Sequence, residues 1–399
     1  MDHSSSRRTF LQSFGVGAAV FGLSTSGAAR QNKIPGFEEA STDPEASRGW
    51  QPVSDRKVRV GIVGYGTCRF GAAFGFQDHP NVEVAAVSDL FPDRRAQLAE
   101  RCRCKTTYPS LEELIKDDSI EAVFVATDAP SHARHCINVL EHGKHVASAV
   151  PAVWGSLEDA NQLYEAVKKS GLKYMMFETS CYRANCYAMR QIYRAGGFGK
   201  LIFSEGEYYH YHSRQIGSYK GWRIGSIPLW YPTHSTAYYV GVTDQPFTSV
   251  SCTGSNAGFE SYQPGANRYG NTFTDEIALL ETAEGGTSRM LMCKGIHGKV
   301  RETGRVFGEK GWMDGLEYHG VMKDLPDMSR PPLPPGVDAG GHGGSHGPLT
   351  DEFVCSILQD RKPLVSISQA LNMTVCGIVA HQSALKDGQR LDVPHYKPL

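Results

Sequence analysis

The chain lacks any apolar run long enough to cross a bilayer as a helix. The apolar segment Phe14 to Leu23 is short and contains three glycines, whereas a membrane-spanning helix needs about 20 residues. An excess of either charge is also lacking, because 41 Lys and Arg face 42 Asp and Glu and leave a net charge of −1. We therefore expect no nucleic-acid partner and no stable membrane insertion.

Paired cysteine motifs of the kind that bind metals are lacking too, although the chain has ten cysteines. Cys102 and Cys104 are close in sequence but have no matching second pair. Others, such as Cys355 and Cys376, stand among apolar neighbours, which is typical of small buried hydrophobic side chains. The cysteines therefore predict no metal site.

The N-terminal segment Ser5 to Leu11, which contains Arg7 and Arg8, resembles a twin-arginine export signal. A short apolar run and small residues follow it, so we expect residues 1–30 to be a signal peptide. The protein would then be exported folded, to the periplasm or beyond. A cytoplasmic tail with a chance arginine pair is the alternative. Residues 31–56, rich in proline and acidic side chains, are predicted to be a linker.

Residues 57–178 are predicted to form a Rossmann domain with a parallel, doubly wound sheet. Near-continuous apolar strands alternate there with amphipathic helical patterns, as in sheets that helices cover on both faces. The predicted strands are 58–63, 82–87, 122–126, 145–147 and 173–177, and the predicted helices are 94–102, 110–116 and 132–142. A capping box at Ser156 predicts the start of another helix.

Residues 179–399 are predicted to form a second α/β domain with a mostly antiparallel sheet. Alternating or β-forming segments follow one another there without intervening helices, at 201–211, 247–253, 275–282 and 287–292. Two helices, 349–358 and 367–385, close the chain after a long irregular loop that is rich in proline and glycine.

A glycine turn between the first strand and the first helix predicts a dinucleotide site. Gly64 and Gly66 place backbone N–H groups and a helix N-terminus where a pyrophosphate can bind. Asp89 follows the next strand, where a carboxylate binds the ribose 2′-hydroxyl and favours NAD over NADP. The third glycine of the usual pattern is replaced by Arg69. Arg94 and Arg95 keep NADP as an alternative cofactor. The other alternative is a Rossmann-like sheet that binds no nucleotide.

From Val58 to His145 the chain resembles the Gfo/Idh/MocA oxidoreductases, through the pieces GIVGYG, AVSD, YPSLEELI, EAVFVATDAPSHARH and EHGKHV. The resemblance implies an NAD-binding Rossmann domain, a second domain with a large open sheet, and a substrate bound between them. An open sheet face favours a homo-oligomer. Residues in or beside the matched pieces are predicted to contact the cofactor: Thr67, Thr127, His132 and Pro151.

Typical dehydrogenase members of that family carry Glu-Lys-Pro after the last matched strand, and the Lys acts in proton transfer. The chain has Ala149, Val150 and Pro151 there. It resembles instead the NAD-dependent glycoside hydrolases typified by α-N-acetylgalactosaminidase, through KHVASAVP, MMFE with Cys181-Tyr182, Glu205-Gly206, Trp222-Arg223 and YPTH. Those enzymes hold NAD, oxidise the sugar at C3, eliminate the aglycone, add water and reduce the ketone.

By matched position, the resemblance implies that Tyr182, Tyr231 and His234 are catalytic and that Arg223 contacts the sugar. Trp222 and His210 are predicted to contact the sugar as well. Pro232 disfavours a long helix, yet a single turn can aim Tyr231 and His234 at one cavity. Since the family's Glu before Val-Pro is Ala149 here, the sugar specificity does not carry over.

Three weaker features leave alternatives open. His210, His212 and Glu207 could suggest a metal, but a hydrogen-bonded sheet face is the favoured interpretation. His342 and His346 belong either to a loop over the ligand or to a plain surface loop. Glu178 is predicted to help position the nicotinamide end of the cofactor.

The sequence thus predicts an exported NAD-dependent enzyme that acts on a carbohydrate. Redox-neutral cleavage with retained cofactor is favoured over net oxidation, because the Lys is missing and no pool of free NAD exists outside the cytoplasm. A sugar dehydrogenase and a non-catalytic sugar-binding protein are the alternatives.

Overall fold

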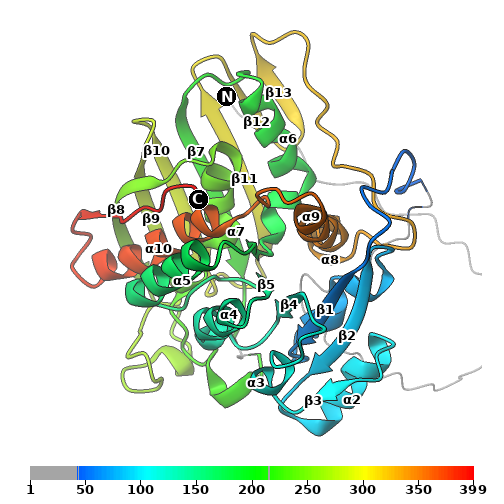
Figure 1. Ribbon diagram of the computed structural model, residues 1–399. Coiled ribbons are helices and arrows are strands. Elements are labelled where there is room, and N and C mark those ends of the chain that lie inside the picture. The colour runs from blue at the N-terminus through cyan, green and yellow to red at the C-terminus, as the bar shows by residue number, and fades with distance from the viewer. Residues whose placement is uncertain (1–42, 44, 214–215) are drawn as a thin grey trace, which may run out of the picture. The chain divides into compact units, whose positions relative to one another are not determined.

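The structure is a computed structural model that describes residues 43, 45–213 and 216–399. The predicted signal peptide and half of the predicted linker lie outside the described residues. Two sheets organise the described part of the chain (Figure 1).

The first sheet has six strands in the order β3-β2-β1-β4-β5-β6, and all its pairings are parallel. Its strands are β1 Val58–Val63, β2 Val82–Ser88, β3 Thr107–Tyr108, β4 Ala122–Val125, β5 His145–Ser148 and β6 Tyr174–Met176. Every residue of β4 is buried, as expected of a strand with helices on both faces. This confirms the predicted Rossmann sheet. The short edge strand β3 was not predicted.

The helices of this domain connect its strands. They are α1 Phe70–Ala73, α2 Pro92–Arg101, α3 Leu111–Leu114, α4 His132–Glu141 and α5 Leu157–Ser170. Ser156 caps α5, since its Oγ accepts a hydrogen bond of 3.0 Å from the Asp159 N–H. The helix after the glycine turn has only four residues, so the expected helix N-terminus at the pyrophosphate is much reduced.

The second sheet has eight strands in the order β13-β12-β11-β7-β10-β9-β8-β14. Its strands are β7 Leu201–His210, β8 Phe247–Ser255, β9 Asp275–Thr282, β10 Thr287–Cys293, β11 Val300–Gly308, β12 Gly311–Asp314, β13 Glu317–Gly320 and β14 Leu391–Asp392. Only the β7–β10 pair is parallel among the described pairings. Residues of β9 alternate between buried and exposed along most of the strand, so this sheet has one packed face and one open face.

The helices of the second half of the chain are α6 Ala184–Arg194, α7 Thr233–Thr236, α8 Gly341–Gly344, α9 His346–Leu358 and α10 Ile367–Ala384. Helices α7 and α10 pack on the second sheet, whereas α9 contacts β1 of the first sheet. Helix α10 is buried almost all round, because it contacts β8 on one side and α5 and β6 of the first domain on the other (Figure 1). The helix thereby joins the two domains into one packed body.

Among the described residues, no helix combines the length and the apolar character that a membrane span requires.

Candidate active site

The glycine turn after β1 fits a bound dinucleotide. Gly64 has φ +104°, and a Cβ there would stand 2.3 Å from the Ala126 carbonyl oxygen, so only glycine fits. Gly66 lines the groove beside the turn, with no atom within 4 Å of where its Cβ would stand, which leaves room for a phosphate. Gly71 has the role of the motif's third glycine, which allows the helix to pack closely on the strand. A Cβ on Gly71 would stand 2.4 Å from the Gly64 carbonyl oxygen.

Asp89 holds this turn and also faces the groove. Its Oδ2 accepts a hydrogen bond of 2.7 Å from the Tyr65 N–H, and its Oδ1 accepts one of 2.9 Å from the Phe91 N–H. A carboxylate has about four acceptor sites, so both oxygens keep capacity for the hydroxyls of a ribose. The position fits the predicted ribose contact.

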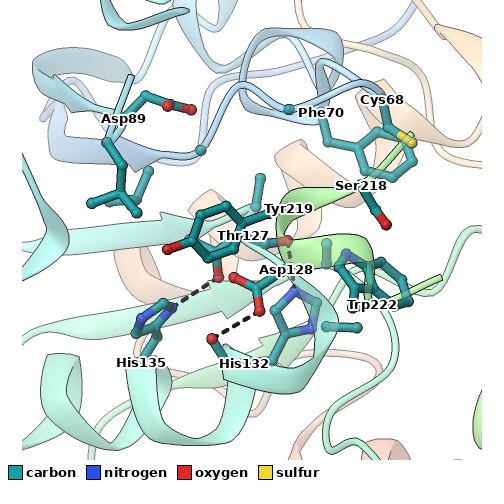
Figure 2. A pocket seen from close by; sticks show the side chains of 18 of the residues that line it. Cys68, Phe70, Asp89, Thr127, Asp128, His132, His135, Ser218, Tyr219 and Trp222 are labelled. Carbon is teal, nitrogen blue, oxygen red and sulfur yellow. Dashed lines mark hydrogen bonds between the residues drawn. The ribbon is translucent and has the colours of Figure 1, made fainter. Parts of the chain in front are cut away.

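The groove runs along the carboxyl ends of β1, β2, β4 and β5, where doubly wound sheets bind their ligands. A segment of the second domain forms its opposite wall. The Thr67 hydroxyl donates a 2.7 Å hydrogen bond to the Gly217 carbonyl, and Figure 2 shows Tyr219 reaching into the groove near Thr127. Both domains therefore contribute to the predicted cofactor site.

Most of the predicted cofactor residues line this groove: Gly64, Gly66, Thr67, Asp89, Thr127 and His132. Pro151 is not among the lining residues; its carbonyl instead accepts a hydrogen bond from His132 Nδ1 at 2.8 Å. That bond places the imidazole at the floor of the groove, and the Thr127 carbonyl oxygen lies 3.3 Å from His132 Nε2 (Figure 2). Pro151 thus acts through His132.

A second, polar pocket adjoins the groove. It is lined by Cys68, Phe70, Trp154, Tyr208, His210, His212, Ile216, Trp222, Arg223, Ser226, Tyr231, His234, Met292, Lys294 and His342. Cys68, Trp222, Arg223 and Tyr231 line both spaces. The structure therefore brings five of the predicted catalytic and sugar-contacting residues together beside the predicted nicotinamide end of the groove: Tyr231, His234, Arg223, Trp222 and His210.

His234 forms a hydrogen-bonded dyad with a buried carboxylate. Helix α7 begins directly after Pro232 and carries His234 into the pocket, while Glu178 follows β6. The His234 Nδ1 lies 2.7 Å from Glu178 Oε1, and both side chains are almost fully buried. Burial alone would lower the pKa of His234, but the negative charges of Glu178 and Glu302 outweigh it and raise that pKa above 6.5.

Glu178 was predicted to help position the nicotinamide end of the cofactor, and this stays a prediction. Its side chain is not among the residues that line the groove. Its Oε1 also accepts a 2.8 Å hydrogen bond from the Ser180 N–H. Glu178 therefore orients the imidazole of His234 and leaves Nε2 as the nitrogen that faces the pocket.

A second carboxylate, Glu302 on β11, lies next to the dyad. Arg183 donates to it through Nε at 2.6 Å and through Nη2 at 2.8 Å, and the Ser180 hydroxyl donates to Oε1. Burial would raise the pKa of Glu302, yet the positive charges of His234 and Arg183 lower it to about 2.

Glu178, His234 and Glu302 also offer three metal-ligand atoms within 4.8 Å of one another. Arg183 and Ser180 already occupy the Glu302 oxygens, and His234 Nδ1 is occupied by Glu178. The contacts fit an ion-pair network.

Tyr231 precedes this turn and faces the same pocket. Its ring centroid lies 5.4 Å from that of His234, and Tyr208 of β7 lies 4.6 Å from the imidazole. Burial raises the pKa of Tyr231 well above its ordinary value. The phenol therefore stays protonated near neutral pH and can orient a substrate hydroxyl.

The structure does not bring Tyr182 to this pocket. Tyr182 is 3% exposed and stacks on Tyr187 at 5.9 Å between ring centroids. It lines a separate cavity with Arg190, Glu352 and Arg361. The short helical turn after Glu178 aims Ser180, rather than Tyr182, at His234. A catalytic role for Tyr182 through direct substrate contact does not fit this placement.

The glycine-rich loop contributes His342 to the polar pocket. His346 Nδ1 lies 3.0 Å from the Ala73 carbonyl oxygen and 3.3 Å from the Gly341 backbone nitrogen. His346 Nε2 lies 2.9 Å from His342 Nδ1, so the two rings are hydrogen-bonded. The His342 ring stacks over that of His234 at 6.3 Å. The sequence left two interpretations of this loop, and the geometry favours a loop that lies over the ligand rather than a plain surface loop.

Sequence reasoning missed Glu302, Arg183, Ser180 and Lys294. Glu302 and Arg183 are 119 residues apart and meet only because β11 pairs with β7. Strand β11 carries charged residues on its open face, so its pattern gave no strand prediction. The signal that could have found Glu302 is a charged residue at a strand position that faces the packed side of the sheet.

The family model described as "Oxidoreductase family, NAD-binding Rossmann fold" matches residues 58–178. The model is that of the Gfo/Idh/MocA oxidoreductases, and these residues are similar to it. The match covers the first sheet and ends at Glu178, so the NAD-binding assignment agrees with the glycine turn and Asp89 described above.

The chain is similar to curated proteins named for glycosyl hydrolase family 109. "Glycosyl hydrolase family 109 protein 1" of Bacteroides fragilis is 29% identical over 207 residues, which are 49% of this chain and 44% of that protein. The chain thus spans less than half of that relative in the match. "Glycosyl hydrolase family 109 protein" of Saccharopolyspora erythraea is 25% identical over 85% of this chain and 82% of that protein.

Solved structures share the whole fold. A levoglucosan dehydrogenase in complex with NADH and levoglucosan superposes with a TM-score of 0.68 at 18% identity, over 86% of this chain and 100% of that one. The myo-inositol dehydrogenase of Lactobacillus casei, with NAD(H) and myo-inositol, gives 0.65 at 16% identity, over 86% and 98%. At these identities the likeness shows the fold.

Protein purified without added nucleotide is expected to release NAD on denaturation, and Asp89→Ala is expected to lower the NAD content. The substitution removes the carboxylate for the ribose and leaves the Tyr65 and Phe91 N–H groups without their acceptor. Asp93→Ala, at an exposed position of α2, is the matched control. Chromatography of the supernatant after denaturation measures the content. Equal content in the two variants would contradict the assignment of Asp89.

Proposed function

We propose that the protein is an NAD-dependent enzyme that acts on a carbohydrate, and that it cleaves a glycoside without net redox change. The observation that carries this proposal is the shared wall of Trp222, Arg223 and Tyr231 between the cofactor groove and the polar pocket. A sugar in the pocket would lie directly beside the nicotinamide end of a dinucleotide in the groove. The names of the family 109 relatives and of the sugar dehydrogenases support the substrate class.

NAD, when bound, supplies reversible hydride transfer with the sugar carbon that lies against it. A base of the protein must accept the proton of the hydroxyl group on that carbon at the same time. His234 Nε2 faces the pocket and fits this role, since Glu178 holds the ring in one tautomer and stabilises the imidazolium that forms. The Tyr231 hydroxyl donates to or accepts from the same sugar and fixes its position.

Once C3 is a ketone, the proton on C2 is acidic. Its loss to a base of the pocket expels the aglycone from C1 with the bonding electrons. Water would then add to the unsaturated sugar, and the hydride held by bound NAD would restore the C3 hydroxyl together with a proton from the pocket. Each proton that leaves is given back within the cycle, so the balanced reaction is hydrolysis.

Two sequence features support retention of the cofactor. The Lys that typical dehydrogenase members use is Val150 here, and Val150 lines the cofactor groove. The predicted export signal would place the protein where free NAD is not supplied. A panel of aryl glycosides tests the function: we expect release of the phenol without accumulation of NADH. Stoichiometric NADH and a stable ketone would make the protein a dehydrogenase, and binding without turnover would make it a sugar-binding protein.

Export by the twin-arginine route is part of the proposal and has its own test. Arg7→Lys together with Arg8→Lys is expected to leave the precursor in the cytoplasm with its N-terminus intact. Immunoblotting of cell fractions measures this, with Arg30→Lys as a control outside the pair. Unchanged export of the double variant would contradict the twin-arginine assignment.

We also propose self-association through the open face of the second sheet. Large apolar side chains stay exposed on three of its strands: Ile202 is 58% exposed, Leu279 54% and Trp312 41%. Between Leu279 and Trp312 the face carries the ion pairs of Glu205 and Glu207 with Arg289 and Arg305, so a partner surface of the same chain would meet both apolar and charged side chains.

A further inference from the structure

The polar pocket is rich in positive and potentially positive side chains and contains no carboxylate among its lining residues. Arg223 and Lys294 are cations, and four imidazoles join them: His210, His212, His234 and His342. The cofactor groove carries charges of both signs, since Asp89, Glu112 and Asp128 line it together with Arg69, Arg94, Arg134, Lys220 and Arg223. The polar pocket differs from the groove in that no carboxylate lines it.

Lys294 is 6% exposed and lies at the end of β10. Its ammonium donates to the Ser226 carbonyl at 2.6 Å, to the Ser226 hydroxyl at 2.7 Å and to the Tyr262 hydroxyl at 3.2 Å. All three partners are uncharged, and among the described residues no carboxylate lies within ion-pair distance of this ammonium. The three bonds fix the ammonium in place while its charge remains uncompensated.

Arg223 is also without a carboxylate partner in the described part of the chain. Its guanidinium stacks on the Trp222 ring at 4.2 Å, and Nη2 makes a long contact of 3.7 Å with Cys68 Sγ. The planar face is therefore held by the indole while the edge keeps N–H donors for a ligand. A guanidinium edge matches a carboxylate or a sulfate, which accept two parallel hydrogen bonds.

His210 supplies a second and independent sign of a missing ligand. The side chain is buried, 9% exposed, and its Nδ1 has no hydrogen-bond partner among the described residues. Its ring lies 3.9 Å from that of His212. Burial and the neighbouring positive groups lower the pKa of His210 to about 3 and that of His212 to about 4. An anion in the pocket would compensate the positive charges that surround these two imidazoles.

We propose that the pocket binds a sugar that carries an anionic substituent, either a carboxylate or a sulfate ester. Arg223 supplies directed donors to that group, Lys294 supplies fixed positive charge, and His210 and His212 supply further donors. The proposal rests on the proposed function, because it names the substrate class of the same pocket. It goes beyond that function, because a neutral glycoside would leave both cations uncompensated.

Calorimetric titration of the NAD-loaded protein with matched sugars tests the proposal. Glucuronate and galacturonate are compared with glucose and galactose, and the 6-sulfates of glucose and galactose form the third arm. At least one acidic sugar is expected to bind about tenfold or more tightly than its neutral counterpart, as one charge-assisted contact provides. A preference for the uronates identifies a carboxylate, and a preference for the sulfates identifies a sulfate ester.

Variants separate the pocket from general charge effects. Arg223→Gln and His212→Gln are expected to reduce the ratio of acidic to neutral affinity at least severalfold. His319→Gln, at an exposed position of β13, is expected to leave it unchanged. The proposal would be overturned if every acidic sugar bound no more tightly than its neutral counterpart. It would also be overturned if no acidic sugar bound measurably. Cleavage of neutral aryl glycosides alone would uphold the proposed function and still overturn this inference, so the two can fail separately.

Discussion

His234→Asn is expected to slow turnover by roughly 10²–10⁴-fold, the usual scale for the loss of a positioned acid or base. The amide nitrogen of Asn can still donate to Glu178, so the buried carboxylate keeps a partner, but the variant has no proton-accepting nitrogen in the pocket. NAD content is expected to stay unchanged, because His234 lies outside the cofactor groove. Rates on a productive glycoside and NAD released on denaturation measure both effects.

Two companion variants sharpen this result. Tyr231→Phe is expected to slow turnover by a factor in the same range, since the substitution removes the hydroxyl that orients the sugar. Glu178→Gln removes the carboxylate charge that raises the pKa of His234. A base with a lower pKa loses its proton at lower pH, so the ascending limb of the kcat/KM profile is expected to move to lower pH while the maximum falls. A full-rate His234→Asn variant would exclude His234 from proton transfer.

Arg183→Met is expected to lower the free energy of unfolding by about 3–5 kcal/mol, the scale for a buried charge that loses its partner. Glu302 is only 5% exposed at its side chain, and Arg183 binds both of its oxygens. Methionine fills much of the same space but leaves the carboxylate buried beside Glu178. Urea unfolding of the purified variant measures the difference.

The double variant Arg183→Met with Glu302→Gln is the matched control, because it removes both charges and is expected to recover much of the loss. Arg390→Met breaks an exposed pair with Glu281, in which the side chains are 62% and 49% exposed. Exposed pairs contribute about 1 kcal/mol or less. If Arg183→Met costs no more than Arg390→Met, the network of Glu302 is not the buried ion pair described here.

The first domain could be predicted from the sequence because its strands are buried on both faces. Strands such as Ala122–Val125 are therefore apolar throughout, and the glycine turn marks where the first one ends. The second sheet was predicted where its strands alternate, as in Asp275–Thr282, or are rich in β-forming residues, as in Thr287–Cys293. Strands β11 to β13 were missed, since their exposed sides carry charges and turns that also suit loops.

Part of the site could be predicted because short motifs place their own residues. Pro232 directly precedes α7, so Tyr231 and His234 flank the start of the helix and line one pocket. The helix does not stop after one turn as expected, because the π-helix Ala237–Gly241 continues it. The partners of His234 could not be predicted in the same way. Glu302 reaches it only through the pairing of β11 with β7, and the role of Glu178 depends on the packing of β6 against α7. Such contacts arise from tertiary structure and leave no local pattern.

Turnover of a productive glycoside in D₂O tests the central claim most directly. If the hydride leaves C3 and returns in the same cycle, the sugar product is expected to keep hydrogen at C3. The C2 proton exchanges with solvent through a base of the pocket, so deuterium is expected at C2, and no NADH should accumulate. Proton NMR of the released sugar reads both positions. Cleavage that leaves hydrogen at C2 would contradict the account and indicate direct hydrolysis without redox chemistry.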